Sequence, residues 1–561
     1  MIQDTLTRLL ADAASVAASD LGLDRAEIPT PELLKPRLKE HGDWSSNIAL
    51  VLAPQVGRAP REVAESLAAR IPTDDLILRV EVAGPGFINL FLSDRWLHDL
   101  LAEILERGPN YGREQPDGKR VQVEFVSANP TGPLHVGTAR NAVLGDSLAN
   151  VLEAAGYEVE REYYWNDTGT QMELLGASVE ARYLQLFGVE AEVPEGGYQG
   201  EYLRDLAEQI KSDFGDRLLD EDPAKRRHIL MLEARRRMFD AIMQTLARFG
   251  VRFDTFKTEA DLVDSGEVAE AVERLRQAGY AYDADGAVWF RSTDFGDDKD
   301  RVLIRRTGEP TYFAKDCAYL LDKASRGFDR MVYVWGADHH GDVKRVLGAA
   351  QVLGIDPTRV QIVLYQLVSL YRGGEPVRMS KRSGDIIWLD ELLEEVGPDA
   401  ARYTLLTRSH DSALDFDIEL VKRQSMDNPV YYVQYAHARV ASLLRVASEQ
   451  GVAPRSWKEA NFSLLEHESE LSLLRKLGEL PEVVATAAEA LVPHRLTRYA
   501  EEAAAAFHHF YTQCRVITDD EPLTQARLWL STATKYVIAA ALRLIGVTAP
   551  ESMERIRGDA P

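Results

Sequence analysis

The most informative stretch of the sequence, residues 121–146, changes its hydrophobic period halfway along. Its first five residues alternate between apolar and polar as in a strand, residues 129–133 break any regular element, and helical spacing resumes from Ala139. This strand–loop–helix pattern places His135 and Gly137 where a helix begins at the edge of a parallel sheet. Backbone N–H groups and the helix dipole favour phosphate there. Gly137 lets a ligand approach the backbone closely, and His135 supplies a hydrogen-bond donor.

A second group of chemically useful residues follows the continuous apolar run 331–335, which is typical of a strand buried on both faces. Gly336, Asp338 and His339 come directly after it. A carboxylate can bind ribose hydroxyls, and a glycine allows close approach to the backbone. The neighbouring histidines His339 and His340 could instead bind a metal, but the sequence offers no third ligand at a suitable spacing.

Tyr312 and Asp316 form a third candidate pair. Their separation of four residues in a helical pattern places a phenol and a carboxylate on one helical face. Such a pair can hold a planar cation between an aromatic ring and an anion. On spacing alone, an ordinary structural role for the two residues is equally well supported.

Two segments of the chain resemble known signatures. Residues 133–137, after a strand, resemble the HIGH signature of the class I aminoacyl-tRNA synthetases, and residues 124–137 resemble the arginyl branch of that class. One position departs from the signature, because Thr138 stands where its second histidine usually falls. A threonine hydroxyl can still donate a hydrogen bond to phosphate.

Residues 377–384 resemble the KMSKS loop of the same class, with Arg378 at the position of the first lysine. A loop that carries a cation can close over a triphosphate and stabilise the charge that develops as pyrophosphate leaves. We expect Lys381 to have this role. An isolated basic loop would carry little information, but here it follows the other signature in the right order.

The resemblance implies roles for individual residues. Tyr312 and Asp316 match the arginine-binding Tyr-x-x-x-Asp motif of the family, and His135 and Lys381 would be catalytic by positioning and by charge stabilisation. The ATP-binding residues would be His135, Gly137, Thr138, Gly336, Asp338, Met379, Ser380 and Lys381. The arginine-binding residues would be Glu124, Asn129, Glu259, Tyr312, Asp316 and His339.

Composition limits the class of protein. The chain has 561 residues, 45% of them hydrophobic, and no apolar run approaches the length of a membrane span. Its start fits neither a signal peptide nor a transit peptide, so we expect a cytoplasmic enzyme. The two cysteines, Cys317 and Cys514, exclude a disulfide framework. A net charge of −24 argues against non-specific binding of nucleic acid.

The pattern of elements predicts an α/β protein with a class I Rossmann-like parallel sheet. We expect an N-terminal α+β domain at 1–108, which by resemblance contacts tRNA, with a hairpin around 84–86. The catalytic domain would span 109–398, with a mainly helical insertion around 171–252 and a strand at 361–370. Residues 399–561 are expected to be wholly helical and to form the linker and the anticodon-binding bundle.

Two features leave alternatives open. Residues 225–252 carry eight positive charges against two negative ones, and they could face RNA or simply solvent. On the helix predicted after Asn428, Tyr431, Tyr435 and Arg439 could bind anticodon bases, while core tyrosines are an equal alternative.

The sequence as a whole is identified as a member of the class I arginyl synthetases, which activate L-arginine with ATP and transfer it to tRNA(Arg). Mg²⁺ would accompany ATP rather than occupy a tightly bound metal site. We expect a monomer that binds no DNA and no membrane. One rival function is a class I synthetase for another amino acid, which Glu259, Tyr312 and Asp316 oppose. The other is a catalytically silent RNA-binding relative, which His135, Gly137 and Lys381 oppose.

Overall fold

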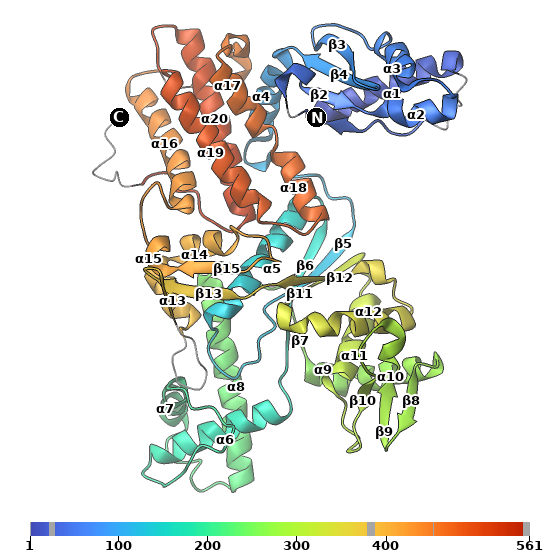
Figure 1. Ribbon diagram of the computed structural model, residues 1–561. Coiled ribbons are helices and arrows are strands. Elements are labelled where there is room, and N and C mark those ends of the chain that lie inside the picture. Colours follow the sequence, from blue (N-terminus) through green and yellow to red (C-terminus); the bar gives the residue numbers. More distant parts are fainter. Residues whose placement is uncertain (1, 22–27, 37, 378–386, 453, 554–561) are drawn as a thin grey trace. The chain divides into compact units, whose positions relative to one another are not determined.

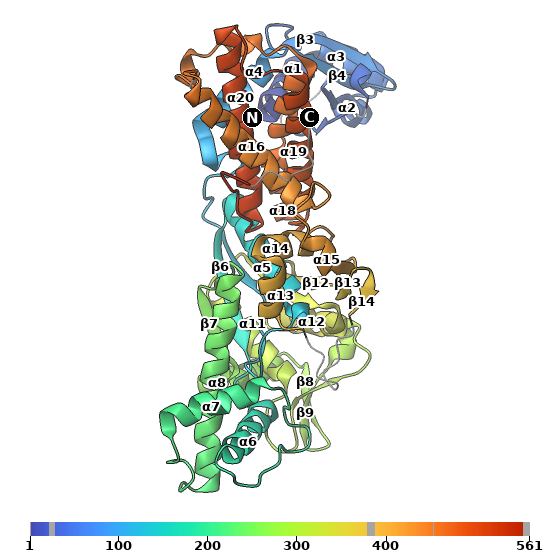
Figure 2. The same ribbon diagram turned by 90° about the vertical axis from the view of Figure 1, so that its left-hand side faces the viewer.

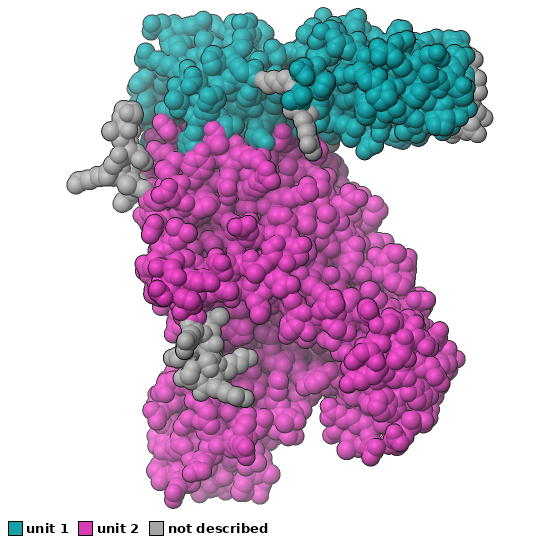
Figure 3. Space-filling view, in the orientation of Figure 1, with its two compact units in different colours: residues 1–108, 443–478, 506–534 teal, residues 109–442, 479–505, 535–561 magenta. Residues whose placement is uncertain are grey.

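The computed structural model describes residues 2–21, 28–36, 38–377, 387–452 and 454–553. The chain divides into two compact units, which Figure 3 distinguishes by colour. Unit 1 comprises Met1–Gly108, Leu443–Gly478 and Ala506–Thr534, and unit 2 comprises Pro109–Ser442, Glu479–Ala505 and Lys535–Pro561. Within the described ranges, no helix is both long enough and apolar enough to cross a membrane.

The N-terminal part of unit 1 is built on a four-stranded antiparallel sheet of order β1-β2-β4-β3 (Figure 1). The predicted hairpin is confirmed, because β3 and β4 pair across residues 84–86. Helices α1, α2 and α3 share a buried apolar core with this sheet. The elements are α1 (Ile2–Leu21), β1 (Leu33–Leu34), β2 (Trp44–Ser46), α2 (Ile48–Val56), α3 (Pro60–Ala68), β3 (Ile77–Ala83), β4 (Phe87–Leu92) and α4 (Arg95–Arg107).

Unit 2 is built on a five-stranded parallel sheet of order β12-β11-β5-β6-β7. Its strands are β5 (Arg120–Glu124), β6 (Glu158–Trp165), β7 (Thr255–Thr258), β11 (Arg330–Gly336) and β12 (Val360–Tyr365). When the five strands are numbered 1 to 5 in chain order, so that β5 is strand 1, their order from the β7 edge is 3-2-1-4-5. This is the order of a doubly wound Rossmann fold. The predicted fold class is therefore confirmed. Helix α5 (Val136–Ala154) joins β5 to β6, as the change of period predicts.

Two long connections interrupt this sheet. Between β6 and β7, the helices α6 (Thr170–Gln185), α7 (Tyr202–Phe214) and α8 (Pro223–Arg248) pack on one another, and they lie side by side in both Figure 1 and Figure 2. Between β7 and β11 come α9 (Glu259–Asp264), α10 (Glu267–Gln277), the antiparallel strands β8 (Ala281–Ala284), β9 (Ala287–Phe290) and β10 (Arg301–Ile304), and α11 (Tyr312–Ser325). Helix α12 (Val343–Val352) then joins β11 to β12.

Two predictions about residues 361–417 are wrong. The single strand predicted at 361–370 is two strands, because the chain leaves the parallel sheet at Gln366 and enters another sheet as β13 (Val368–Arg372). The region after Asp399 is not wholly helical, because it contains β15 (Leu414–Asp417), which pairs in parallel with β13. On its other edge, β13 pairs antiparallel with β14 (Glu375–Pro376). In β15 the buried Leu414 and Phe416 alternate with acidic residues, which is the pattern of a half-buried strand.

Helices make up the rest of the described chain. The predicted start of a helix after Asn428 is confirmed, since α16 begins at Pro429. The helices are α13 (Leu389–Val396), α14 (Pro398–Leu405), α15 (Ile418–Val421), α16 (Pro429–Glu449), α17 (Glu468–Leu477), α18 (Leu480–Glu489), α19 (Arg495–Gln513) and α20 (Glu521–Leu544).

Candidate active site

The candidate site lies where the strand order of the parallel sheet reverses, at the carboxyl ends of β5 and β11. These two strands are neighbours, yet their connections leave in opposite directions along the sheet, which opens a crevice in folds of this type. The buried Asn141 of α5 ties the two strand ends together. Its side-chain Oδ1 accepts from the backbone N–H of Val126 at 2.5 Å, and its Nδ2 donates to the Val334 carbonyl at 2.8 Å.

His135 and Gly137 meet at the first turn of α5. His135 is the N-cap residue, with an extended backbone, and its carbonyl accepts from the Thr138 N–H at 2.9 Å. The imidazole lies against Gly137, because a Cβ at that glycine would be 2.8 Å from the Nδ1 of His135. Any larger residue there would push the ring away from the helix N-terminus. The structure thus brings His135, Gly137 and Thr138 together, as the sequence predicts.

The segment after β11 reaches the same edge of the sheet. A Cβ at Gly336 would overlap the Asp338 carboxylate, so the glycine allows that carboxylate to fold back over the strand end. The Asp338 side chain is exposed. His339 is half-exposed, and the hydrogen bond of its Nδ1 to Asp342, at 2.9 Å, raises its pKa. Among the described residues, no group of three or more His, Cys, Asp or Glu side chains has a metal-binding arrangement.

Tyr312 and Asp316 occupy the first two turns of α11. The helix begins there because the hydroxyl of Thr311 caps it, accepting from the Ala314 N–H at 3.3 Å. Tyr312 is 55% exposed, and its hydroxyl accepts from the Nδ2 of Asn166 at 3.4 Å. Burial, together with the nearby carboxylates of Glu124, Asp342 and Glu259, raises the pKa of Asp316 to about 7.

We call Glu124, Glu259, Asp316 and Asp342 the acidic cluster. Three of its members already have cationic partners: Glu259 pairs with Lys315, Asp342 with Arg345 and His339, and Glu124 with Lys323 at 2.6 Å. Within the part of the chain that the structure describes, Asp316 has no such ion pair. The cluster therefore holds one uncompensated acid, which lies beside the exposed phenol of Tyr312.

Glu259 and Asn129 are placed by local structure. Glu259 is the first residue of α9, directly after Thr258, and Thr258 and Asp261 form a reciprocal capping box there. Asn129 bridges the loop after β5 to the loop after β6. Its Oδ1 accepts from the Asn166 N–H at 3.0 Å, and its Nδ2 donates to Gln171 at 2.8 Å. Both residues therefore lie at the carboxyl edge of the parallel sheet.

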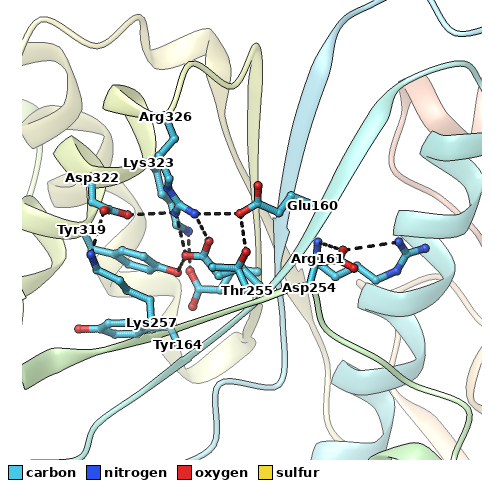
Figure 4. A network of polar contacts seen from close by, with 12 residues as sticks. Glu160, Arg161, Tyr164, Asp254, Thr255, Lys257, Tyr319, Asp322, Lys323 and Arg326 are labelled. Atoms are coloured by element: carbon cyan, nitrogen blue, oxygen red, sulfur yellow. Dashed lines mark hydrogen bonds and ion pairs between the residues drawn. The ribbon is translucent and has the colours of Figure 1, made fainter. Parts of the chain in front are cut away.

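Several residues of the site were missed by sequence reasoning. Lys315, Tyr319 and Lys323 lie on α11 beside Tyr312 and Asp316, and Figure 4 shows Tyr319 and Lys323 within a larger polar network. Residues 312, 316, 319 and 323 follow helical spacing, which could have indicated a shared face. To assign Lys323 to the site, one would also have had to know that its side chain is buried, which is rare for lysine.

The second predicted signature cannot be placed. Met379, Ser380 and Lys381 lie outside the described residues, together with Arg378. Chain on both sides of this segment is described, and β14 precedes it. After it, Ile387 accepts a backbone hydrogen bond from Val136 at the start of α5, at 3.4 Å.

The basic run at 225–252 forms α8 and the turn after it, and most of its charges are already paired. Arg226 and Arg227 bind Glu180, Arg235 binds Asp167, and Arg248 binds Asp390. The remaining ion pairs of α8 join Lys225 to Glu221, Arg236 to Glu233 and Asp240, Arg237 to Asp213 and Glu233, and Arg248 also to Glu394. This pairing favours the alternative in which the basic run faces solvent over the one in which it faces RNA.

The three residues predicted to meet tRNA lie on α16. Tyr431 is 8% exposed, and its ring stacks on that of Tyr435 with centroids 6.2 Å apart. The Arg439 guanidinium lies over the Tyr435 ring, 5.9 Å from its centroid. Tyr435 and Arg439 are half-buried. The three residues form one stack along the helix.

Comparisons with known proteins cover almost the whole chain. The family described as "Arginyl tRNA synthetase N terminal domain" matches residues 2–92, "tRNA synthetases class I (R), catalytic domain" matches 100–422, and "DALR anticodon binding domain" matches 433–553. An arginine–tRNA ligase of Moorella thermoacetica is 50% identical over 99% of this chain and 100% of its own length. One of Desulforudis audaxviator is 50% identical over 98% of each chain.

The fold is also similar to a solved structure. The arginyl-tRNA synthetase of Thermus thermophilus superimposes with a TM-score of 0.74, at 24% sequence identity, over 99% of this chain and 100% of that one. The likeness therefore extends through the catalytic sheet and the C-terminal helices.

Proposed function

The chain belongs to the class I arginyl-tRNA synthetase family and is an arginine–tRNA ligase, and on that premise we propose how its residues divide the reaction. The enzyme activates L-arginine with ATP to arginyl-adenylate and pyrophosphate, and then transfers the arginyl group to the 3′ end of tRNA. Attack of the arginine carboxylate on the α-phosphorus needs no protein nucleophile. The protein therefore has to position the two substrates and stabilise charge.

We propose that Asp316 binds the guanidinium of arginine, with Tyr312 and Glu259 beside it. The observation that carries this assignment is that, in the described part of the chain, Asp316 is the acid of the acidic cluster without an ion pair. A guanidinium offers five donors in a rigid fork, whereas lysine or ornithine offers a compact ammonium and would leave acceptors unpaired. Aminoacylation of tRNA with labelled arginine, lysine and ornithine tests the assignment, and arginine alone should be accepted.

The other roles follow the geometry at the sheet edge. Glu124, Asn129 and His339 lie at the ends of β5 and β11, and they would receive the α-amino end of arginine. ATP would lie across the crevice, with its phosphates at the first turn of α5 and its ribose near Asp338. The full set proposed for ATP is His135, Gly137, Thr138, Gly336 and Asp338, with Met379, Ser380 and Lys381 proposed from the sequence alone.

The raised pKa of Asp316 predicts a pH-dependent affinity for arginine. Below about pH 7 the free enzyme carries a proton on this carboxyl, and a neutral Asp316 cannot pair with the guanidinium. Arginine must then expel the proton as it binds. We expect KM for arginine to be constant above about pH 8 and to rise by up to about tenfold per unit below pH 7, by linkage. Steady-state aminoacylation from pH 5.5 to 9 measures it.

The control for this pH profile is Asp316→Asn, since His339 also titrates nearby, with a raised pKa. The asparagine variant should have a higher KM for arginine that no longer changes near pH 7. KM for ATP should lack the inflection in both proteins. An inflection that survives in Asp316→Asn would assign the titration to another group.

The proposed role of Lys381 predicts a loss in rate rather than in binding. Its cation would act on the leaving pyrophosphate, and an interaction made mainly in the transition state lowers the barrier without changing ground-state affinity. We expect Lys381→Ala to slow adenylate formation about tenfold, which is about 1.4 kcal/mol in the barrier. Single-turnover adenylate formation measures it. An unchanged rate, or a loss confined to the Kd for arginine, would contradict the role.

The remaining assignments complete the proposal. Mg²⁺ would enter with ATP, because it usually binds through substrate phosphates rather than through a cage built by the protein. Tyr431, Tyr435 and Arg439 would bind tRNA(Arg), and the enzyme would act as a cytoplasmic monomer. The functional domains would be residues 1–108, 109–398 with the insertion at 171–252, and 399–561. The matching of residues 433–553 to an anticodon-binding domain supports the last of these.

A further inference from the structure

A fully buried lysine lies beside the acidic cluster. Lys323, on α11, is 0% exposed, and its Nζ donates to the Oε2 of Glu124 at 2.6 Å. The same ammonium lies over the rings of Tyr333 and Tyr319, 3.4 and 4.1 Å from their centroids. Figure 4 shows Lys323 reaching into the network between α11 and the parallel strands. An isolated buried ammonium is strongly disfavoured, so this one needs its carboxylate partner.

Glu124 is held on both of its oxygens. Lys323 takes Oε2, and the hydroxyl of Ser127 donates to Oε1 at 3.0 Å. Ser127 and the preceding Val126 both have positive φ angles, +44° and +65°, which are unfavourable for residues with side chains and mark a loop held by its surroundings. The hydroxyl of Ser127 also accepts from the Tyr164 N–H at 3.2 Å. The position of Glu124 is therefore linked to the shape of the loop after β5.

Glu162, the other acid near Lys323, has its own partners. Its carboxylate is bound by the Arg326 guanidinium, with 2.9 Å between Nη2 and Oε1, and by the Tyr319 hydroxyl. Burial lowers the pKa of Lys323, and the carboxylates of Glu124 and Glu162 oppose that shift. Because Glu162 is satisfied by Arg326, the carboxylate that depends on Lys323 is that of Glu124.

We propose that Lys323 is a positioning residue for arginine binding, which holds the Glu124 carboxylate in place at the end of β5. This rests on the proposed assignment of Glu124 to the arginine site. Lys323 follows Asp316 by seven residues, or about two helical turns, so both side chains lie on the same face of α11. One helix then supplies the acid for the guanidinium and fixes the acid for the other end of the substrate. Its ammonium also balances the charge of Glu124 next to Asp316.

A double-mutant cycle with Lys323→Met and Glu124→Gln tests the proposal in the full-length enzyme. In the wild-type background, we expect Lys323→Met to raise KM for arginine by about tenfold and to change KM for ATP by less than about twofold, because Glu124 loses its anchor. In the Glu124→Gln background, the same change should alter KM for arginine by less than about twofold. An equal rise in both backgrounds would mean that Lys323 acts through another contact, and would overturn the proposal.

The matched control is Lys257→Met. Lys257 belongs to the same network but pairs with Asp322, at 2.9 Å, rather than with the acidic cluster (Figure 4). Its replacement should leave KM for arginine within about twofold while lowering thermal stability. A rise equal to that of Lys323→Met would show a general effect of disturbing the network, and would also overturn the proposal.

Two outcomes distinguish a failure of this proposal from a failure of the assignment of Glu124 to the arginine site. If Lys323→Met fails to fold, the double variant removes both charges together, and the proposal expects its KM for arginine to equal that of Glu124→Gln. A difference of more than about threefold between these two would overturn the role of Lys323. If Glu124→Gln alone leaves KM for arginine unchanged, the assignment of Glu124 to the arginine site fails, whatever the behaviour of Lys323.

Discussion

Asp316→Asn is expected to lower kcat/KM for arginine by about a hundredfold or more, with little change in KM for ATP. The substitution keeps the shape of the side chain and removes the one acid of the cluster that has no ion pair among the described residues. Removing one partner of a desolvated charge pair costs roughly 3–5 kcal/mol, which corresponds to a loss of that size in kcat/KM. Aminoacylation kinetics across arginine concentrations measure it.

The matched control for this prediction is Asp322→Asn, the same chemical change two turns further along α11. Asp322 pairs with Lys257 and Arg326 and lies outside the acidic cluster. It should lower stability but keep kcat/KM for arginine within about threefold, because its partners are structural. If Asp316→Asn lowers kcat/KM for arginine no more than Asp322→Asn does, then Asp316 does not face the guanidinium.

The parts of the site that the sequence predicted well are those encoded locally. The change of period at 121–146 located β5, the loop and α5, because each element has its own spacing of apolar residues. Tyr312 and Asp316 could be paired because one helix carries both. The alternation of strands and helices predicted a parallel sheet, whereas the order of its strands is known only from the structure.

The charge state of the site could not be predicted in this way. Lys323 and Glu124 are separated by 199 residues in the chain, and no periodicity relates them. Glu259 is read from sequence as an available acid, yet Lys315 already binds it. The same limit explains the basic run of α8, whose arginines are neutralised by acids from other elements. Which acid stays unpaired, and so binds a cation, depends on tertiary contacts.

The missed strands have a related cause. β15 pairs in parallel with β13, which is distant in sequence, so no turn between the two strands reveals their pairing. The hairpin of β13 is with β14, across Gly373 and Gly374. The run 361–370 is mostly apolar, and the chain leaves one sheet for another at Gln366, where no glycine or proline marks the change. β15 lies between helices and has only four residues, which are too few for a period of two to be recognised in the sequence.

A buried arginine joins α5 to several other elements of unit 2. Arg402 of α14 is 1% exposed and donates to the carbonyls of Ile545, at 3.0 Å, and Phe249, at 2.8 Å. It also forms an ion pair with Asp146 of α5, which is 3% exposed. A Cβ at Gly546, which has a φ of +68°, would overlap the guanidinium. One side chain therefore links α5 and α14 with the chain just after α8 and α20.

Arg402→Met is expected to lower the free energy of unfolding by about 3–5 kcal/mol, because it leaves Asp146 buried without its cation and two carbonyls without their donor. The double variant with Asp146→Asn should recover part of this loss, since it removes the uncompensated charge. The matched control is Arg372→Met, whose guanidinium is about half exposed and pairs with Glu395 and Glu419. Exposed ion pairs contribute about 0–1 kcal/mol, so this control should lose far less stability although Arg372 forms more ion pairs than Arg402. Urea unfolding followed by circular dichroism compares the three variants with the wild type. Equal losses for Arg402→Met and Arg372→Met would mean that the number of ion pairs, rather than burial, sets the contribution of each arginine.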